Sequence, residues 1–227
     1  NLTLNAPEGF VINIYADNLT NPRWLALTPD GNVLVALTNQ SEILLLKDTN
    51  GDGVADFNTT FLNSSNGINE TFGMAFTSDS FYAGNPNENL RYPYTSGVDN
   101  ITEPPVKIAD LPVQKEGTRT LALSPDGQTL YVTVGASTEI TNDEPYLGTV
   151  VSMDLDGSNQ QIFASGLRDP KGLAFHPVSQ ELYIGVAERD DLGDDVPPDY
   201  FTRIREGEFF GWPLTYVSPD NLDPREI

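Results

Sequence analysis

The sequence predicts an all-β protein of the β-propeller class, with about four blades present of an expected six. Three observations indicate this class. Four similar segments recur along the chain, and each contains two short apolar strands joined by a turn. The matched alanines Ala26, Ala75, Ala122 and Ala174 lie 49, 47 and 52 residues apart. No segment has the 3.6-residue apolar period of an amphipathic helix.

The four segments begin at Asn21, Glu70, Gly117 and Asp169. The first reads NPRWLALTPDGNVLVALTN and the third reads GTRTLALSPDGQTLYVTVG. Both contain Pro-Asp-Gly, in which Pro presets φ, Asp bonds back to the backbone and Gly accepts a positive φ. The segments therefore predict inner hairpins of successive blades. A β-sandwich with a chance internal similarity is the alternative.

Outer strands are expected between these hairpins, at residues 41–47, 89–94, 149–155 and 161–164. Residues 8–15 (EGFVINIY) predict one further strand before the first repeat. We expect blades at about 8–60, 61–108, 109–158 and 159–208, and the start of a fifth at 209–227. Because a propeller closes to remove its sheet edges, a further segment or another chain is expected to complete the ring.

Composition excludes several classes of protein. The net charge is −21 and the 12 Lys and Arg are scattered, so no basic surface for nucleic acid is expected. No apolar run reaches the roughly 18 residues of a membrane span. Residues 1–10 lack the basic-then-apolar pattern of a signal peptide, so any such segment is expected to be already removed.

Seven Asn-X-Ser/Thr triplets crowd the first 102 residues, and none follows. They are the acceptor pattern for N-glycosylation and favour a secreted, extracellular glycoprotein. The expected glycosylation sites are Asn1, Asn18, Asn39, Asn58, Asn63, Asn69 and Asn100.

Residues 48–56 (DTNGDGVAD) have the spacing of a calcium loop. Such a loop offers side-chain oxygens at positions 1, 3 and 5, a Gly at 6 and a carbonyl at 7. A Thr stands where an EF-hand has its bidentate Glu, so the expected role is to fix an outer hairpin. An Asx-rich turn without metal is the alternative. The expected ligands are Asp48, Asn50, Asp52, the Val54 carbonyl and Asp56.

Beyond these patterns, four stretches together resemble the glucose/sorbosone dehydrogenases. They are residues 48–56, 118–135 (TRTLALSPDGQTLYVTVG), 166–177 (GLRDPKGLAFHP) and 187–216 (AERDDLGDDVPPDYFTRIREGEFFGWPLTY). The resemblance runs from residue 4 to residue 225 in the family's order. It implies a six-bladed propeller that uses pyrroloquinoline quinone (PQQ) and calcium to oxidise sugars.

The resemblance also implies a site. It places a calcium ion on the backbone carbonyls of Asp190 and Asp191, and it places Arg168 against the anionic quinone. Two positions differ from the family. Asp169 stands where the family has Asn, and Glu116, three residues before Arg119, stands where it has its general base, a histidine. The cofactor residues expected here are Arg119, Arg168 and Asp169, and the catalytic candidate is Glu116.

Two functions of different class follow. One is a PQQ- and calcium-dependent sugar dehydrogenase that oxidises the C1 hydroxyl of an aldose. The other is a non-catalytic glycosylated propeller that binds a polysaccharide or another component of an extracellular assembly, which Glu116 in place of histidine favours. A lactonase-type hydrolase is a third, weaker reading. The one histidine, His176, is expected to be structural, and neither a Ser-His-Asp set nor a zinc site can be assembled.

Overall fold

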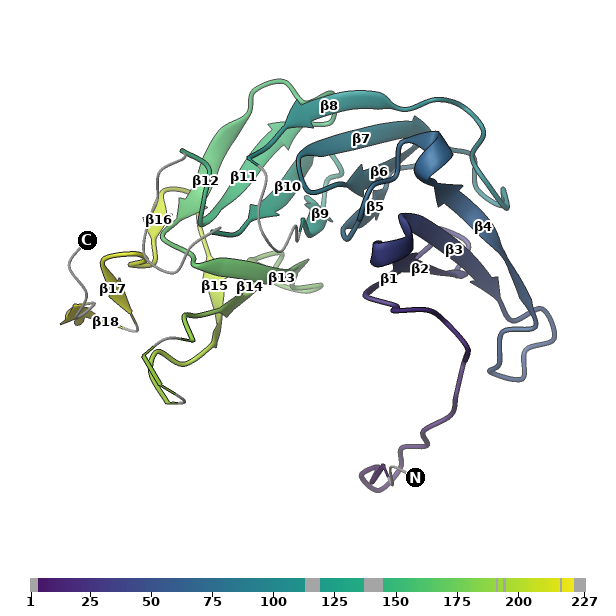
Figure 1. Ribbon diagram of the computed structural model, residues 1–227, viewed down its shortest axis with the longest axis horizontal. Coiled ribbons are helices and arrows are strands. Elements are labelled where there is room, and N and C mark those ends of the chain that lie inside the picture. Colours follow the sequence, from purple (N-terminus) through teal and green to yellow (C-terminus); the bar gives the residue numbers. More distant parts are fainter. Residues whose placement is uncertain are drawn as a thin grey trace.

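A computed structural model of the protein describes residues 4–112, 119–136, 145–190, 192–193, 195–216 and 218–222. Its strands form a curved row of antiparallel sheets, which is the propeller arrangement that the repeats predicted (Figure 1). The strands are β1 (Trp24–Leu27), β2 (Val33–Leu37), β3 (Glu42–Lys47), β4 (Phe57–Asn63), β5 (Met74–Phe76), β6 (Ser80–Gly84), β7 (Glu88–Pro93), β8 (Val106–Asp110), β9 (Leu121–Leu123), β10 (Thr129–Val134), β11 (Thr149–Asp154), β12 (Gln161–Ser165), β13 (Asp169–Phe175), β14 (Leu182–Ala187), β15 (Tyr200–Ile204), β16 (Glu208–Phe209), β17 (Thr215–Tyr216) and β18 (Ser218–Leu222). Two short 3-10 helices cover Thr38–Gln40 and Ser64–Asn66.

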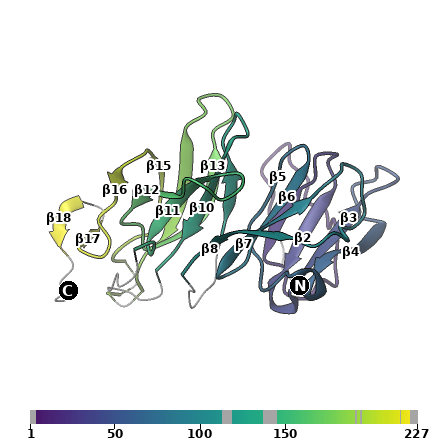
Figure 2. The same cartoon turned by 90° about the horizontal axis from the view of Figure 1, so that it is seen from above.

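Each blade is an antiparallel meander. The first sheet has the order β1-β2-β3-β4 and the second has β5-β6-β7-β8. The third has β9-β10-β11-β12, and the fourth has β13-β14-β15. The first strands of the four sheets contact one another in series, β1 with β5, β5 with β9 and β9 with β13. These first strands are therefore the innermost strands, and Figure 2 shows the sheets following one another in chain order.

The two Pro-Asp-Gly turns form as the sequence predicted. Gly31 has φ of +86° and Gly127 has φ of +68°, a backbone region that favours glycine. The N–H of Gly31 donates to the Thr28 carbonyl at 2.9 Å, and the N–H of Gly127 donates to the Ser124 carbonyl at 2.8 Å. These turns fix the register of the inner hairpins, with Ala26 opposite Leu34 and Leu130 opposite Leu123.

Apolar side chains fill the spaces between successive sheets. The space between the first and second sheets is aromatic, with the Phe61 and Phe81 rings 5.3 Å apart at nearly a right angle. Tyr82 and Val132 belong to the cluster between the second and third sheets, and Ile184 to the cluster between the third and fourth. Each pair of successive sheets therefore buries an apolar cluster of its own between facing sides, and this burial stabilises the row of sheets.

The expected strand at residues 8–15 is wrong. This segment forms no ladder with any described strand. Its last residue, Tyr15, packs beside the first sheet and its carbonyl accepts from the N–H of Ala55 at 2.8 Å, while the residues before it extend away as an arm (Figure 1). Phe10, Val11 and Ile14 on it are 73%, 83% and 71% exposed. Its alternation of side chains suits a strand, but a strand also requires a neighbouring edge, and no described element offers one here.

The blade limits also differ from those expected. Strand β12 belongs to the third sheet, so that sheet ends at residue 165 rather than 158. Of the region expected to begin a fifth blade, β16 pairs in parallel with β12 at the outer edge of the third sheet. The rest forms the β17–β18 hairpin. None of the described helices is long and apolar enough to cross a membrane.

Candidate cofactor site

A cluster of charged side chains lies where two innermost strands begin. Arg119 comes just before β9, and Arg168 and Asp169 stand at the start of β13. Asp169 is opposite Ala187 at the end of β14, so the antiparallel pairing brings Glu188 to the same end of the fourth sheet. Strand ends that meet at one rim are thus the source of the cluster.

Asp169 is the buried carboxylate of this cluster and is surrounded by cations. Only 5% of the residue is exposed. The ammonium nitrogen of Lys171 lies 2.6 Å from its Oδ2, and Nη1 of Arg168 lies 3.6 Å from the same oxygen. Asp169 also acts on Arg119: burial lowers the pKa of Arg119 to about 10, and the charge of Asp169 opposes that shift. Three cations therefore act on Asp169, and one of them, Arg168, also acts on the carboxylate of Glu188 at the same rim.

Arg119 itself is fully buried, and two glycines make room for it. A Cβ on Gly73 would lie 2.0 Å from the Arg119 carbonyl oxygen, and one on Gly84 would lie 2.9 Å from the Arg119 Cβ. The guanidinium donates to the carbonyl of Pro112. The second sheet, through Gly73 and Gly84, therefore fixes the position of a residue that precedes the third.

Hydrogen bonds join the third and fourth sheets at this rim. The hydroxyl of Thr120 donates to the Lys171 carbonyl. Thr120 is itself held within the third sheet, where its N–H donates to Oγ1 of Thr133 at 2.9 Å. The N–H of Ala136 donates to the Arg168 carbonyl at 2.7 Å. These bonds hold the backbones that carry Arg168 and Lys171 against the third sheet.

A second buried ion pair follows β14. Glu188 is 4% exposed, and burial raises the pKa of its carboxyl group, while Arg189 opposes this shift. Nε of Arg189 lies 3.2 Å from Glu188. Its other nitrogens donate to the carbonyls of Pro213 and Thr215, both at 3.1 Å, and its guanidinium lies 5.5 Å from the ring centre of Tyr216. Arg189 thus ties the β17 segment to the rim.

The structure brings together three of the residues that the sequence singled out, Arg119, Arg168 and Asp169. Asp190 follows Arg189 on the same rim and is exposed. Glu116 and Asp191 lie outside the described residues. Sequence reasoning missed Lys171, because its side chain reaches Asp169 from an irregularity in β13 that depends on the pairing of this strand with β14.

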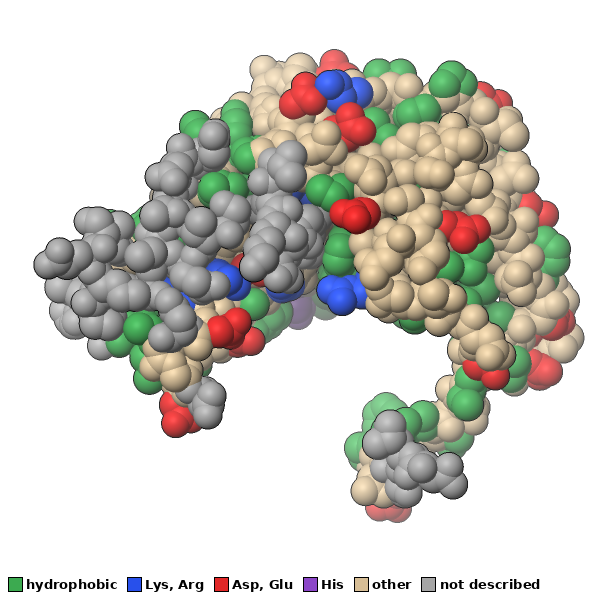
Figure 3. Space-filling model, in the orientation of Figure 1, with side chains coloured by type: hydrophobic (Ala, Val, Ile, Leu, Met, Phe, Trp, Pro, Cys, Tyr) green, Lys and Arg blue, Asp and Glu red, His purple; other side chains and the backbone are tan. Residues whose placement is uncertain are grey.

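Charge is distributed unevenly over the molecule. Several Lys and Arg side chains lie along the inner edge of the arc with a few Asp and Glu side chains beside them, and many of the other Asp and Glu lie around the outside (Figure 3). In a protein of net charge −21, the cations along this inner edge are the ones that an anionic ligand could meet there.

The predicted calcium loop folds as a turn rich in side-chain acceptors. Asp48 accepts from the N–H groups of Gly51 at 2.7 Å and Gly53 at 2.8 Å, and Asp56 accepts from the N–H of Thr49 at 2.9 Å. Hydrogen bonds from these backbone groups lower the pKa of both carboxyl groups. Within the described ranges no three His, Cys, Asp or Glu side chains are grouped to hold a metal, so calcium in this loop stays a prediction.

Six of the seven predicted glycosylation sites lie in the described part of the chain, and Asn1 lies outside it. Asn63 is half-buried, and its Oδ1 accepts from the N–H of Ser65 at 2.9 Å. The exposed sites are Asn18, Asn39, Asn58, Asn69 and Asn100.

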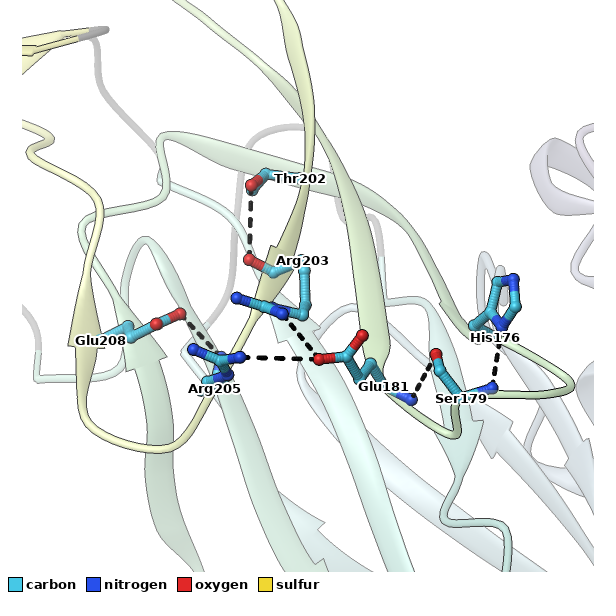
Figure 4. A network of polar contacts seen from close by, with 7 residues as sticks. All are labelled: His176, Ser179, Glu181, Thr202, Arg203, Arg205 and Glu208. Atoms are coloured by element: carbon cyan, nitrogen blue, oxygen red, sulfur yellow. Dashed lines mark hydrogen bonds and ion pairs between the residues drawn. The ribbon is translucent and has the colours of Figure 1, made fainter.

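A groove of about 690 Å³ lies at the other end of β13. Aromatic residues line it, among them Trp24 of β1, Tyr183 and Phe201. His176 is also at this end, and its Nδ1 accepts from the N–H of Ser179 at 3.0 Å, a turn-forming role that agrees with the structural one expected (Figure 4).

The neighbouring polar network stands apart from the cofactor cluster. The carboxylate of Glu181 lies 2.6 Å from Arg203 and 3.6 Å from Arg205, at the end of β13–β15 opposite Asp169 (Figure 4). The side chains of Glu181 and Arg203 are each 36% exposed and that of Arg205 is 58% exposed. Solvent-exposed ion pairs of this kind contribute little to the stability of a fold.

The fold and this rim define a class of protein. Residues 4–197 match the sequence profile of the TrAA12-like family, so the chain belongs to that family. The family is one of sugar dehydrogenase propellers of the PQQ type, the group that the sequence motifs resemble.

Particular relatives are distant. The quinoprotein glucose dehydrogenase B of Acinetobacter calcoaceticus is 25% identical over 260 residues, which cover 91% of this chain and 53% of that protein. An uncharacterized protein of Borreliella burgdorferi is 23% identical over 227 residues, covering 94% of this chain and 57% of the relative. The chain therefore spans a little over half the length of these relatives.

Solved structures share the fold. The holo PQQ domain of pyranose dehydrogenase from Coprinopsis cinerea superposes with a TM-score of 0.80 at 16% identity, covering 98% of this chain and 62% of that one. A calcium structure of the family AA12 enzyme of Trichoderma reesei gives 0.78 at 18% identity, covering 97% and 63%. The PQQ-bound aldose sugar dehydrogenase of Streptomyces coelicolor gives 0.74 at 21% identity, covering 95% and 70%.

Proposed function

We propose that this chain is part or all of a PQQ- and calcium-dependent sugar dehydrogenase that oxidises the C1 hydroxyl of an aldose. The observation that carries the proposal is the cluster of Arg119, Arg168 and Lys171 around Asp169 at the inner rim. PQQ is a planar quinone with three carboxyl groups, and cations with a net positive balance suit such a ligand. The donor set therefore fits the cofactor.

Each residue has a distinct role in this proposal. Arg168 would bind a carboxylate of the cofactor. Lys171, beside Asp169, and buried Arg119 would hold the rim in place and add positive potential. The backbone carbonyls of Asp190 and Asp191 are the calcium ligands that the family resemblance implies, a choice that suits a hard cation. When bound, PQQ supplies the acceptor for the two electrons that leave the sugar.

Loss of a hydride from C1 requires a base for the hydroxyl proton. We assign this step to Glu116, which stands in the place of the family's histidine. A carboxylate accepts this proton effectively where its pKa is raised towards the working pH, or where the medium is acidic.

The test uses the full-length protein with calcium and PQQ. We expect PQQ binding, seen as a change in quinone absorbance, and reduction of an artificial dye with at least one aldose. Glu116→Gln should bind PQQ as the wild type does but lose turnover, by about 100-fold or more. Glu116→His is the matched control and should retain turnover with a different pH profile. Absence of PQQ binding by the wild type would falsify the proposal.

A non-catalytic propeller that binds a polysaccharide or another extracellular chain is the second candidate, and Glu116 in place of histidine is the observation that favours it. It is distinguished by PQQ-independent binding to a polysaccharide, with no dye reduction by any aldose. We also propose that the protein is secreted and N-glycosylated. The crowding of exposed sequons supports this, and peptide-N-glycosidase treatment of the natural protein should then lower its mass.

A further inference from the structure

Lys171 occupies an irregular position in β13, beside the cofactor cluster. In the pairing of β13 with β14, Pro170 is opposite Val186 and Gly172 is opposite Gly185, so Lys171 is the extra residue of a β-bulge. A bulge changes the direction of the side chain that it carries, and bulges are frequent next to functional sites. Here the bulged side chain reaches Oδ2 of Asp169 at 2.6 Å.

The backbone of Lys171 is held as well as its side chain. Its carbonyl accepts from the hydroxyl of Thr120, which precedes the innermost strand of the third sheet. The lysine side chain keeps 37% of its surface exposed, whereas the carboxylate of Asp169 keeps 7%. One ion-pair partner is thus nearly enclosed, and the other is partly exposed to solvent.

Asp169 by itself would oppose an anionic ligand. A buried carboxylate beside a tricarboxylate brings like charges together in a poorly solvated place, which disfavours binding. The ammonium nitrogen of Lys171 lies 2.6 Å from Oδ2 of Asp169, which is within hydrogen-bond distance. Nη1 of Arg168 lies 3.6 Å from the same oxygen, which is beyond it. The negative charge of Asp169 is therefore balanced first by Lys171.

We propose that Lys171 is a positioning residue of the cofactor site that neutralises Asp169, so that the rim keeps the positive charge needed for a polycarboxylate quinone. The inference rests on the proposed function. The pair of Asp169 and Lys171 takes the place of one neutral side chain, and Arg168 stands beside this pair as a further cation of the rim.

The test is a double-mutant cycle of Lys171→Gln and Asp169→Asn in the full-length protein, with PQQ itself as the probe. Lys171→Gln should weaken PQQ binding by about 10-fold, because it leaves the buried carboxylate unbalanced. Asp169→Asn should bind PQQ at least as tightly as the wild type. The double variant should lie within about threefold of the wild type, and Lys171→Arg should rescue binding.

A ligand-free measurement gives a second readout. Lys171→Gln should lower the midpoint of thermal unfolding, because it leaves the buried carboxylate of Asp169 without this partner. Adding Asp169→Asn should recover most of the loss, because the double variant has no carboxylate at this position. Binding by quinone absorbance and unfolding are measured on the same four proteins.

The outcomes separate the two proposals. Should the wild type fail to bind PQQ, the proposed function and this role both fall. Should the wild type bind PQQ while Lys171→Gln binds it equally well, only the role of Lys171 is overturned. Should Lys171→Gln weaken PQQ binding by the same factor in the wild-type and the Asp169→Asn backgrounds, the role would be overturned as well. That result would show no energetic coupling between Lys171 and Asp169.

Discussion

At the scale of single residues, the effect of Asp169 on the rim depends on its neighbour Lys171. Asp169 in place of an amide is unfavourable for an anionic cofactor when read along the sequence. The structure places Lys171 against it at 2.6 Å through a bulge. A bulge depends on the pairing of two strands, which no local pattern of residues reveals, so this compensation could not be predicted from the sequence.

A second feature at this scale is the close packing around Arg119. It predicts that alanine will be tolerated at one glycine and will destabilise the protein at another. Gly73→Ala should destabilise the protein by about 1–3 kcal/mol or more, because its Cβ would overlap the Arg119 carbonyl oxygen, 2.0 Å away. Gly172→Ala is the matched control, since a Cβ there meets nothing within 4 Å. Chemical denaturation measures both, and equal stabilities for the two variants would contradict the packing described here.

At the scale of elements, the inner hairpins were predictable and the arm was not. Strands β1, β2, β9 and β10 follow from apolar strands around Pro-Asp-Gly, a signal contained within some 20 residues. Residues 8–15 carry an equally good alternation but lack a partner edge within the described structure. Strand formation there depends on a distant neighbour, and local sequence does not encode which neighbour is present.

The loop of residues 48–56 predicts a response to calcium. If its carboxylates bind the ion, millimolar calcium should raise the thermal midpoint and a chelator should reverse the change. Asp52→Asn should abolish that part of the effect. Asp126→Asn is the control, because Asp126 also lies exposed in a turn and accepts a hydrogen bond from Ser124. An unchanged calcium response in Asp52→Asn would show that the ion binds elsewhere.

The same loop predicts a dependence on pH. Hydrogen bonds from backbone N–H groups lower the pKa of Asp48 and Asp56 below the ordinary value of 3.8. A carboxyl group with a lowered pKa in the folded state stabilises that state above its unfolded pKa, and this contribution is lost as pH falls through the folded value. We therefore expect the amides of Gly51 and Gly53 to lose protection from hydrogen exchange below about pH 4, before the buried strands do.

At the scale of the whole molecule, the described sheets form an arc (Figure 1). The sheets at its two ends each leave apolar side chains exposed. Phe201 on the fourth sheet is 73% exposed and stacks on Tyr183, with ring centres 5.4 Å apart. Leu25 and Leu27 on the first sheet are 65% and 67% exposed. The interior clusters show that the other sheet faces are covered by neighbouring sheets, so these end faces are where a ring-closing segment or chain would pack.

The exposed apolar faces of the two end sheets predict how residues 1–227 behave when they are produced on their own. Exposed apolar faces of this kind promote association, so the protein should self-associate as its concentration rises. Phe201→Ser together with Leu25→Ser should reduce association without lowering the thermal midpoint, because both side chains already contact solvent. Phe81→Ser, at a residue with 0% exposure, should instead destabilise the fold by about 3–5 kcal/mol. Light scattering after size-exclusion chromatography measures association. A monomer at all concentrations would contradict this expectation and would mean that these faces are covered in solution. The arm of residues 8–15 would then be the candidate cover for the first sheet, because it carries exposed apolar side chains and immediately precedes that sheet in the chain.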